Sequence, residues 1–264
     1  MSIKKNVQVY NLEGKPTGSI TLPSVFETSL RPDVIKRAVL SIQSHRLQHQ
    51  GRDPMAGKKT SAESRGTGMA LARIPREKGG GGKAAFAPGT VGGRQAHPPR
   101  AETRITKEIP KKEKRLALLS AIAATGSKET VAARGHEVEG VLEIPLIVED
   151  SIAELTKTKE VEDVLTNLGL LTDIYRVRES RNIRAGKGKH RGRKMKQAVG
   201  PLIVVTECKG LVDAAGNIPG VDIVTVKNLN PELLAPGTHP GRLTLWTSSA
   251  INQLEILYGQ GENA

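Results

Sequence analysis

The sequence predicts an α/β protein with a mostly parallel sheet and helices on both faces, a Rossmann-like three-layer fold, plus a long extended irregular loop. Short β-rich runs alternate along the chain with segments of helical period, which is typical of parallel sheets. Residues 201–207 form a largely apolar run, as in strands buried on both faces. We expect one α/β domain formed by 1–50 and 101–264, with 51–100 inserted as the loop and 181–196 as a second basic arm.

The N-terminal half contributes five expected elements. Alternating residues predict strands at 7–10 and 18–22, on either side of a turn-rich stretch that contains Gly14. Pro32 and Asp33 lie in the first turn of a helix expected over 31–43, where apolar residues recur at helical spacing. A second helix is expected over 111–124 and a strand over 142–148.

The C-terminal half continues the alternation of helices and strands. Apolar residues at helical spacing predict helices, and short β-branched runs predict strands. The expected elements are helices at 159–168, 170–178, 231–234 and 248–257 and strands at 201–207, 222–226 and 242–247.

Composition excludes several classes of protein. The longest apolar stretches are far shorter than the roughly 20 residues of a membrane-spanning helix. The N-terminal segment has lysines but no apolar core of a secretory signal, so we expect a cytoplasmic protein without a membrane partner. Cys208 is the single cysteine, which excludes a disulfide framework and a cysteine-rich zinc site. We expect Cys208 to be buried and inert.

The net charge of +13 is concentrated in two segments. Residues 51–100 hold ten basic residues against three acidic ones, and residues 176–200 hold ten against Glu179 alone. The rest of the chain is therefore slightly acidic, so the basicity belongs to these segments and not to the fold.

The first segment, 51–100, cannot form a core of its own. It contains eleven glycines and five prolines but few large apolar residues. A connection of this length is normally a functional loop or a linker, and we expect it to be mobile in the free protein. Glycine also lets backbone approach a partner closely.

The second segment carries eight positive charges within 181–196 and no acid, so self-repulsion is expected to keep it extended. Neutralising phosphates would release counterions and give strong, salt-dependent binding to nucleic acid. A solvated loop normally mixes charge signs, and a membrane-surface segment would need an amphipathic apolar face. RNA is favoured over DNA because no helix-turn-helix, zinc finger or basic zipper is present. The scarcity of aromatic residues favours recognition by shape and phosphate over base stacking.

Sequence motifs that resemble enzyme sites lack the neighbouring elements that such sites need. The glycine runs at 66–71 and 186–192 do not follow an apolar strand, as a nucleotide-binding loop must. His45 and His49 have metal-ligand spacing but no apparent third ligand, so they are expected at the surface. No nucleophile elbow or acid/base pair assembles, so we expect no catalytic residue, metal or cofactor.

Several stretches of the basic segments together resemble one protein family. These stretches are 58–76, 79–82, 86–88, 92–94, 96–99 and 187–193. They resemble the large-subunit ribosomal protein L-four family in its archaeal form, and the similarity covers essentially the whole chain. The resemblance implies an α/β domain on the outer surface of the large subunit that contacts the large rRNA. It also implies a loop that lines the nascent-peptide exit tunnel opposite the L-twenty-two family, and an early role in assembly.

The sequence departs from the family pattern at Met69, where members commonly carry arginine, so no phosphate contact is assigned there. The chain ends at Ala264 without the lysine-rich tail of eukaryotic relatives, which favours the archaeal form.

The expected function is therefore that of a non-catalytic rRNA-binding protein. Its expected partners are large-subunit rRNA, other large-subunit proteins and the nascent peptide. The candidate rRNA-binding residues of the loop are Arg52, Lys58, Lys59, Arg65, Gly66, Gly68, Arg73, Arg76, Lys78, Gly79, Gly80, Gly81, Gly82, Lys83, Arg94, His97 and Arg100. Those of the second arm are Arg181, Arg184, Lys187, Lys189, His190, Arg191, Arg193, Lys194 and Lys196. The alternative is a nucleic-acid-processing enzyme, or another RNA-binding factor, that grips its substrate with the basic arms.

Overall fold

A computed structural model describes residues 6–79, 81–208 and 210–259. The N-terminal residues considered above for a secretory signal, apart from residues 6 and 7, and the candidate residue Gly80 lie outside this description. The chain divides into two compact units, one of residues 1–42 with 108–264 and the other of residues 43–107. The second unit is longer at both ends than the loop expected at 51–100.

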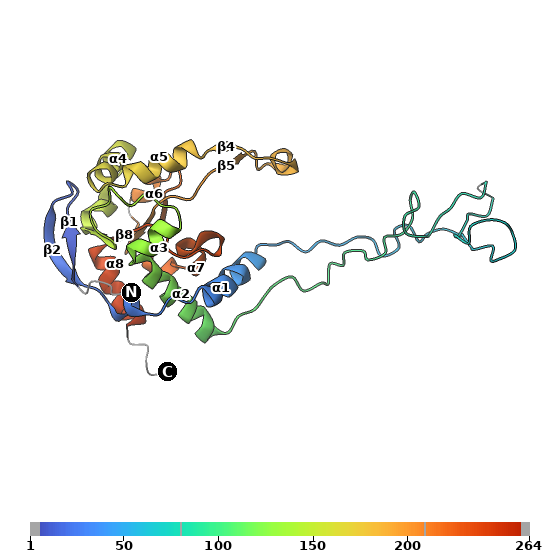
Figure 1. Ribbon diagram of the computed structural model, residues 1–264, viewed down its shortest axis with the longest axis horizontal. Helices are drawn as coiled ribbons and strands as arrows, with labels where there is room; N and C mark the ends of the chain where they lie inside the picture. Colours follow the sequence, from blue (N-terminus) through green and yellow to red (C-terminus); the bar gives the residue numbers. More distant parts are fainter. Residues whose placement is uncertain (1–5, 80, 209, 260–264) are drawn as a thin grey trace. The chain divides into compact units, whose positions relative to one another are not determined.

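The first unit is built on a six-stranded sheet in the order β2-β1-β3-β8-β6-β7. Figure 1 labels β1, β2 and β8 of this sheet. Its strands are β1 (Asn6–Tyr10), β2 (Pro16–Thr21), β3 (Leu146–Val148), β6 (Leu202–Val205), β7 (Asp222–Thr225) and β8 (Thr244–Thr247). Only β1 and β2 pair antiparallel, while every other neighbouring pair is parallel. The predicted α/β class with a mostly parallel sheet is confirmed.

Helices connect these strands, and their bounds agree with the sequence periodicity to within one or two residues. The α-helices are α1 (Pro32–Ser44), α2 (Lys111–Thr125), α3 (Lys128–Ala133), α4 (Thr158–Asn167), α5 (Leu171–Glu179), α6 (Leu211–Ala215), α7 (Pro231–Leu234) and α8 (Ser248–Tyr258). Short 3-10 helices are η1 (Ser24–Glu27), η2 (Asp150–Glu154), η3 (Lys187–Arg191), η4 (Val226–Asn228) and η5 (Pro236–Thr238). The sequence did not predict α3 and α6, because five or six residues are too few to establish a helical period.

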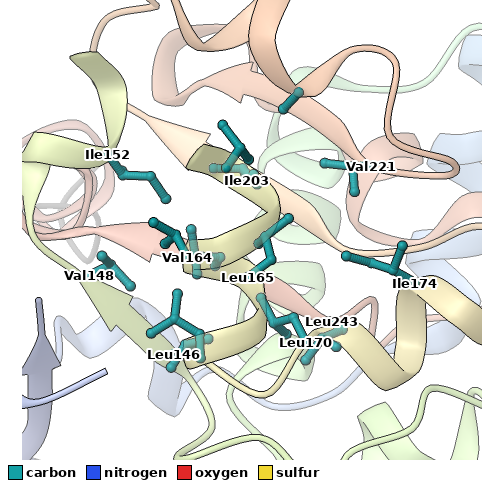
Figure 2. Close-up of a cluster of buried hydrophobic side chains, with 14 of the residues drawn as sticks. Leu146, Val148, Ile152, Val164, Leu165, Leu170, Ile174, Ile203, Val221 and Leu243 are labelled. Carbon is teal, nitrogen blue, oxygen red and sulfur yellow. The ribbon is translucent and has the colours of Figure 1, made fainter. Parts of the chain in front are cut away.

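Consecutive residues of the strands face two separate hydrophobic clusters. Leu146 and Val148 of β3 pack with Val164 and Leu165 of α4 on one face of the sheet (Figure 2). Ile147, between them in the chain, packs in the second cluster. That cluster also contains side chains of α1, α2 and α8: Ile35, Val39, Leu118, Ile122, Ile251 and Leu254. Helices therefore cover both faces, and each fully buried Leu or Ile stabilises the fold by about 1.5–3 kcal/mol.

Two predicted strands begin two or more residues later than expected. The strand predicted over 142–148 joins the sheet only from Leu146 onward. Pro145, the residue before it, has no N–H for a hydrogen bond to a neighbouring strand. The strand predicted over 242–247 begins at Thr244. Arg242, two residues before it, is almost completely buried and turns its guanidinium to other groups.

Arg242 joins the ends of several chain segments in the core. Its Nε donates to the Gly200 carbonyl at 2.8 Å, and its Nη1 donates to the Leu233 carbonyl at 3.0 Å. Its Nη2 lies 2.6 Å from Asp222 Oδ2. Burial lowers the pKa of Arg242 from its ordinary value, and the Asp222 carboxylate opposes that shift. This buried cation is paired and hydrogen-bonded, as buried charges must be.

The expectation that Cys208 is buried was wrong, because its side chain is exposed. It follows β6, at the point where the chain leaves the sheet. Neighbouring groups still desolvate the thiol enough to raise its pKa, so it stays protonated at neutral pH and is a weak nucleophile.

Among the described residues, no helix combines the length and the hydropathy needed to cross a bilayer.

Candidate nucleic-acid interface

The second basic arm forms a closed hairpin and not the extended segment expected from self-repulsion. Strand β4 (Asn182–Ile183) pairs antiparallel with β5 (Met195–Lys196), and η3 lies at the tip. The Arg184 N–H donates to the Lys194 carbonyl at 2.8 Å, and Arg184 Nε donates to the Arg193 carbonyl at 3.1 Å. These backbone carbonyls draw the two basic limbs together in spite of their like charge.

The closed hairpin presents its cationic side chains to solvent. Arg184 is half-buried, and the other candidate residues of the arm are exposed: Arg181, Lys187, Lys189, His190, Arg191, Arg193, Lys194 and Lys196. Within the described part of the chain, none of these side chains makes a salt bridge to a carboxylate. The hairpin is therefore a concentrated positive surface whose charge is not neutralised from within its own unit.

A buried polar network anchors the base of the hairpin to α5. Asp173 is fully buried, with His136 Nδ1 at 3.0 Å from its Oδ2 and Arg176 Nε at 2.8 Å from its Oδ1. The Glu137 N–H donates to the same carboxylate at 3.1 Å. Arg176 also donates to the Val199 carbonyl, in the segment that returns from the hairpin. Arg176 belongs to the basic segment by sequence, but its role in the structure is to position the hairpin.

The network fixes the charge of its members. Burial raises the pKa of Asp173, but hydrogen bonds from His136 and Arg176 outweigh it, so the pKa lies below the ordinary value. Desolvation lowers the pKa of His136, more than the Asp173 carboxylate raises it. At neutral pH the network therefore holds an ionised Asp173 and a neutral His136.

The loop unit contains a small region of β-type pairing. Glu63 and Arg76 exchange backbone hydrogen bonds of 3.1 and 3.0 Å, and Arg76 also pairs antiparallel with Ala84. Arg76 Nη1 also donates to the Gly82 carbonyl at 2.6 Å, which adds a side-chain contact to this pairing. The candidate residue Arg76 is therefore half-buried and holds the loop, whereas the candidate residues Arg73 and Lys78 are exposed.

Most other candidate residues of the loop point to solvent. The exposed basic ones are Arg52, Lys58, Lys59, Arg65, Arg73, Lys78, Lys83, His97 and Arg100. Lys59 pairs with Asp53 at 3.3 Å and Lys78 with Glu63 at 2.7 Å, but exposed pairs of this kind contribute little stability. The Arg94 guanidinium lies 5.8 Å from the centre of the Phe86 ring, within range of a cation–π contact. Met69 is exposed and brings no charge to this surface.

Glycine is needed at Gly57 for a close approach of two chain segments. Gly57 has φ +74°, and a Cβ there would lie 2.5 Å from the Gly93 carbonyl oxygen and from the Arg94 nitrogen. In contrast, Gly66 has φ +73° with no atom near the position of a Cβ. The candidate residues Gly68, Gly79, Gly81 and Gly82 also have positive φ. Gly57, which the sequence did not single out, closes the loop segment 57–93.

The motifs set aside as enzyme sites lie in the following settings. Residues 66–71 contain bends and no helix, and the run that begins at Gly186 opens a 3-10 turn after a strand of two residues. His45 and His49 are exposed. No cluster of three or more histidine, cysteine or acidic residues with metal-binding geometry occurs in the described ranges.

Comparison with known proteins places these basic segments in one family. The sequence profile described as "Ribosomal protein L4/L1 family" matches residues 20–256, which include the loop, the hairpin and most of the sheet. The chain belongs to the ribosomal protein L4/L1 family. The predicted family is thereby confirmed, and so is the prediction of a structural, non-enzymatic protein.

Curated relatives in this family are similar over nearly their whole length. A protein of Methanosphaera stadtmanae is 51% identical over 252 residues, covering 96% of this chain and 97% of the relative. One of Methanococcoides burtonii is 51% identical over 250 residues, covering 95% and 98%. One of Saccharolobus islandicus is 46% identical over 254 residues, covering 96% and 95%. Each is named "Large ribosomal subunit protein uL4", and the similarity to such archaeal members agrees with the predicted archaeal form.

Proposed function

We propose that this member of the L4/L1 family is a structural constituent of the large ribosomal subunit in the cytoplasm, where it binds large-subunit rRNA. The observation that carries the proposal is the β4–β5 hairpin, whose basic side chains, apart from the half-buried Arg184, are exposed. None of them makes a salt bridge to a carboxylate among the described residues. The names of the relatives support the assignment to the large subunit.

The hairpin binds the phosphate groups of the RNA backbone. Each phosphate that a lysine or arginine neutralises releases counterions, which favours binding at moderate salt. Arg191 and Arg193 present forked guanidinium groups that fit phosphate oxygens in pairs. The buried network of His136, Asp173 and Arg176 holds the base of the hairpin, so less conformational entropy is lost when RNA binds.

The α/β unit is the scaffold for this interface. We infer a Rossmann-like three-layer arrangement, which the two hydrophobic clusters on opposite faces of the parallel sheet support. Residues 1–50 and 101–264 form this domain in our proposal, and 51–100 and 181–196 are its two rRNA-binding extensions.

The loop passes between rRNA segments and lines the nascent-peptide exit tunnel opposite a protein of the L-twenty-two family. The resemblance of 58–76, 79–82, 86–88, 92–94 and 96–99 to the family loop supports this part of the proposal, and residues 65–85 form the tip. Arg52, Arg65, Arg73 and Arg100 would contact phosphates along the loop, and the positive-φ glycines would let backbone lie against RNA. A loop that is threaded through folded RNA must enter before the RNA closes, which makes the protein an early participant in assembly.

Sedimentation of a native cell extract tests the proposal. The extract is run through a sucrose gradient at moderate salt and again after a high-salt wash, and the chain is followed by immunoblot. We expect it to stay on the large subunit after the wash, because a threaded loop is not released by screening alone. Release into the light fractions would contradict an integral role and leave only a peripheral electrostatic one.

A further inference from the structure

A pocket of about 420 Å³ lies in the α/β unit at the carboxyl edge of the sheet, and its lining residues lie outside both basic segments. It is lined from the chain that follows β3, β6 and β8. The polar residues that matter here are Asp150, Glu154, Thr206, Glu207, Thr247 and Ser249. The carboxyl edge of a parallel sheet is where open α/β proteins generally bind their ligands.

The charge of the described lining of this pocket is opposite to that of the two basic segments. Asp150, Glu154 and Glu207 are exposed carboxylates, and none of the described lining residues is basic. Phosphates would be repelled here, because like charges at close range oppose association. The described lining therefore favours a cationic occupant over RNA.

Asp150 has a structural task within the pocket. Its Oδ2 accepts a hydrogen bond from the Ser248 hydroxyl at 2.8 Å, and its Oδ1 accepts one from the Ser249 N–H at 3.1 Å. It thus caps the N-terminus of α8. Burial raises the pKa of Asp150, but the hydrogen bonds from Ser249 and Ser248 outweigh it and the pKa stays below the ordinary value.

Glu207 is available to a ligand. It is exposed at the pocket and makes no hydrogen bond or ion pair with the described residues. Its neighbour Thr206 has a buried hydroxyl oxygen that has no hydrogen-bond partner in the described structure.

Thr247 gives independent evidence for a ligand. Its side chain lines the pocket and the residue is 1% exposed, but its hydroxyl has no hydrogen-bond partner among the described residues. It lies near Asp150 and helps to lower the pKa of that carboxyl. A buried hydroxyl without a partner costs about 1–3 kcal/mol, so a partner from outside would be favourable.

The carboxylate and hydroxyl oxygens of the lining determine which kind of ligand the pocket suits. Carboxylates accept hydrogen bonds only, and hydroxyls accept as well as donate, so the pocket suits a cation with several N–H donors. A metal ion is disfavoured, because the described residues contain no cluster of three ligating side chains. A guanidinium group has five N–H donors in a fixed plane and forms paired hydrogen bonds with carboxylates.

We propose that this pocket receives an arginine side chain from a basic segment of a neighbouring protein in the large subunit. Glu207 would accept from the guanidinium at the mouth, and the hydroxyls of Thr206 and Thr247 would accept from it deeper inside. The identity of the neighbour as a large-subunit protein rests on the proposed function, whereas the arginine chemistry rests on the pocket alone.

The chemistry is tested on the isolated full-length chain. An acetylated and amidated Gly-Arg-Gly-Arg-Gly peptide is titrated while the methyl signals of Thr206 and Thr247 are followed by NMR. The control peptide carries citrulline in place of arginine, which keeps the shape and removes the charge. We expect saturable shifts with the arginine peptide and none with citrulline.

Matched variants separate a specific site from general attraction. Glu207→Gln is expected to weaken the arginine peptide about tenfold, the range for a hydrogen bond to a charged group. Glu162→Gln removes the same charge from the exposed face of α4 and is expected to change affinity less than about twofold. Equal losses in both variants, equal binding of the citrulline peptide, or equal shifts with spermidine or Mn²⁺ would each overturn the proposal.

The source of the arginine is tested in assembled particles. A photo-crosslinking amino acid replaces Ala153, and the crosslinked peptide from purified large subunits is sequenced. We expect an arginine-containing peptide of another ribosomal protein, with a yield at least about threefold lower in the Glu207→Gln variant than in Glu162→Gln. A crosslink to rRNA, or none, would overturn the proposal. Absence of the chain from the subunits would instead contradict the proposed function, which the isolated-chain titration does not require.

Discussion

The guanidinium of Arg176 donates a hydrogen bond of 3.0 Å to the carbonyl of Val199. This bond joins α5, which leads into the basic hairpin, to the segment that leaves it. Ser180 adds a second connection, because its hydroxyl accepts from the Ala198 N–H at 2.8 Å. The direction of a strongly charged hairpin is thus set by hydrogen bonds to uncharged backbone groups at its base.

Replacement of Arg176 by methionine should destabilise the α/β unit. The change leaves the fully buried Asp173 without its arginine partner, and breaking such a pair costs about 3–5 kcal/mol. The Arg176 side chain is partly exposed, whereas Asp173 is fully buried. We therefore expect urea unfolding to show a loss of stability near the lower value of this range. Arg178→Met, on the exposed side of the same helix, serves as the control and should change the free energy by less than about 0.5 kcal/mol. Equal losses in the two variants would show that the network is unimportant.

Stability should fall as the pH is lowered from 7 to 4. The pKa of His136 is lowered in the folded state, so its contribution is complete above the ordinary pKa of about 6.5 and is lost as the pH falls toward the folded pKa. The pKa of Asp173 is also lowered, so its contribution is lost at still lower pH, below about 4. Denaturant unfolding across this range measures the effect. His136→Gln should remove the upper phase, and stability that rises from pH 7 to 5 would contradict the assignment.

Gly57→Ala should distort the loop more than Gly66→Ala does. Both positions have positive φ, so alanine is strained at each. Only at Gly57 would the new Cβ also meet backbone, at 2.5 Å from the Gly93 oxygen. We expect faster limited proteolysis within 57–93 and weaker binding to an rRNA fragment for Gly57→Ala. The same behaviour in both variants would mean that the close approach adds nothing beyond the strain in φ.

Deletion of residues 56–95 should leave the α/β unit folded. The deleted segment lies within the 43–107 unit, and both hydrophobic clusters of the sheet are made by residues outside it. With a short glycine-serine linker, cooperative thermal unfolding should persist while incorporation into large subunits falls. Loss of the cooperative transition, measured by calorimetry, would mean that the loop is part of the core.

Neutralising three residues at the hairpin should reduce the dependence of RNA binding on salt. For Arg191→Gln, Arg193→Gln and Lys194→Gln together, the slope of log affinity against log salt should fall by about 2 to 3. Filter binding to a large-subunit rRNA fragment between low and moderate salt gives the slope. A triple variant of exposed lysines on other elements, Lys36→Gln, Lys112→Gln and Lys159→Gln, is the control for net charge. An equal decrease in the control would mean that charge alone, and not the hairpin, determines binding.

The sequence predicted those parts of the fold that have a period. Amphipathic helices such as α1 and α4, and the apolar strand β6, follow from spacing alone. The pairing of β4 with β5 does not, because two-residue strands made of polar and basic residues carry no hydrophobic pattern. The sequence could predict that the basic residues form a positively charged surface. It could not predict that the side chains of Arg76 and Arg176 bind groups within the protein instead.

Buried polar residues were the least predictable part of the site. Arg242 and Asp173 are as polar as their exposed counterparts and are buried only because carbonyls and cations from distant parts of the chain satisfy them. Nothing in the local sequence identifies those partners. The acidic pocket at the carboxyl edge was hidden for the same reason, since its lining comes from three separate stretches of chain.

The closed form of the hairpin has a consequence for the protein before it meets RNA. Two limbs of like charge held at hydrogen-bond distance repel each other, and that repulsion opposes folding until counterions or phosphates screen it. Added salt should then tighten the hairpin of the free protein although it weakens the complex with RNA. A polyanion that is present during synthesis would screen this repulsion. It would therefore favour closure of the hairpin as the chain folds.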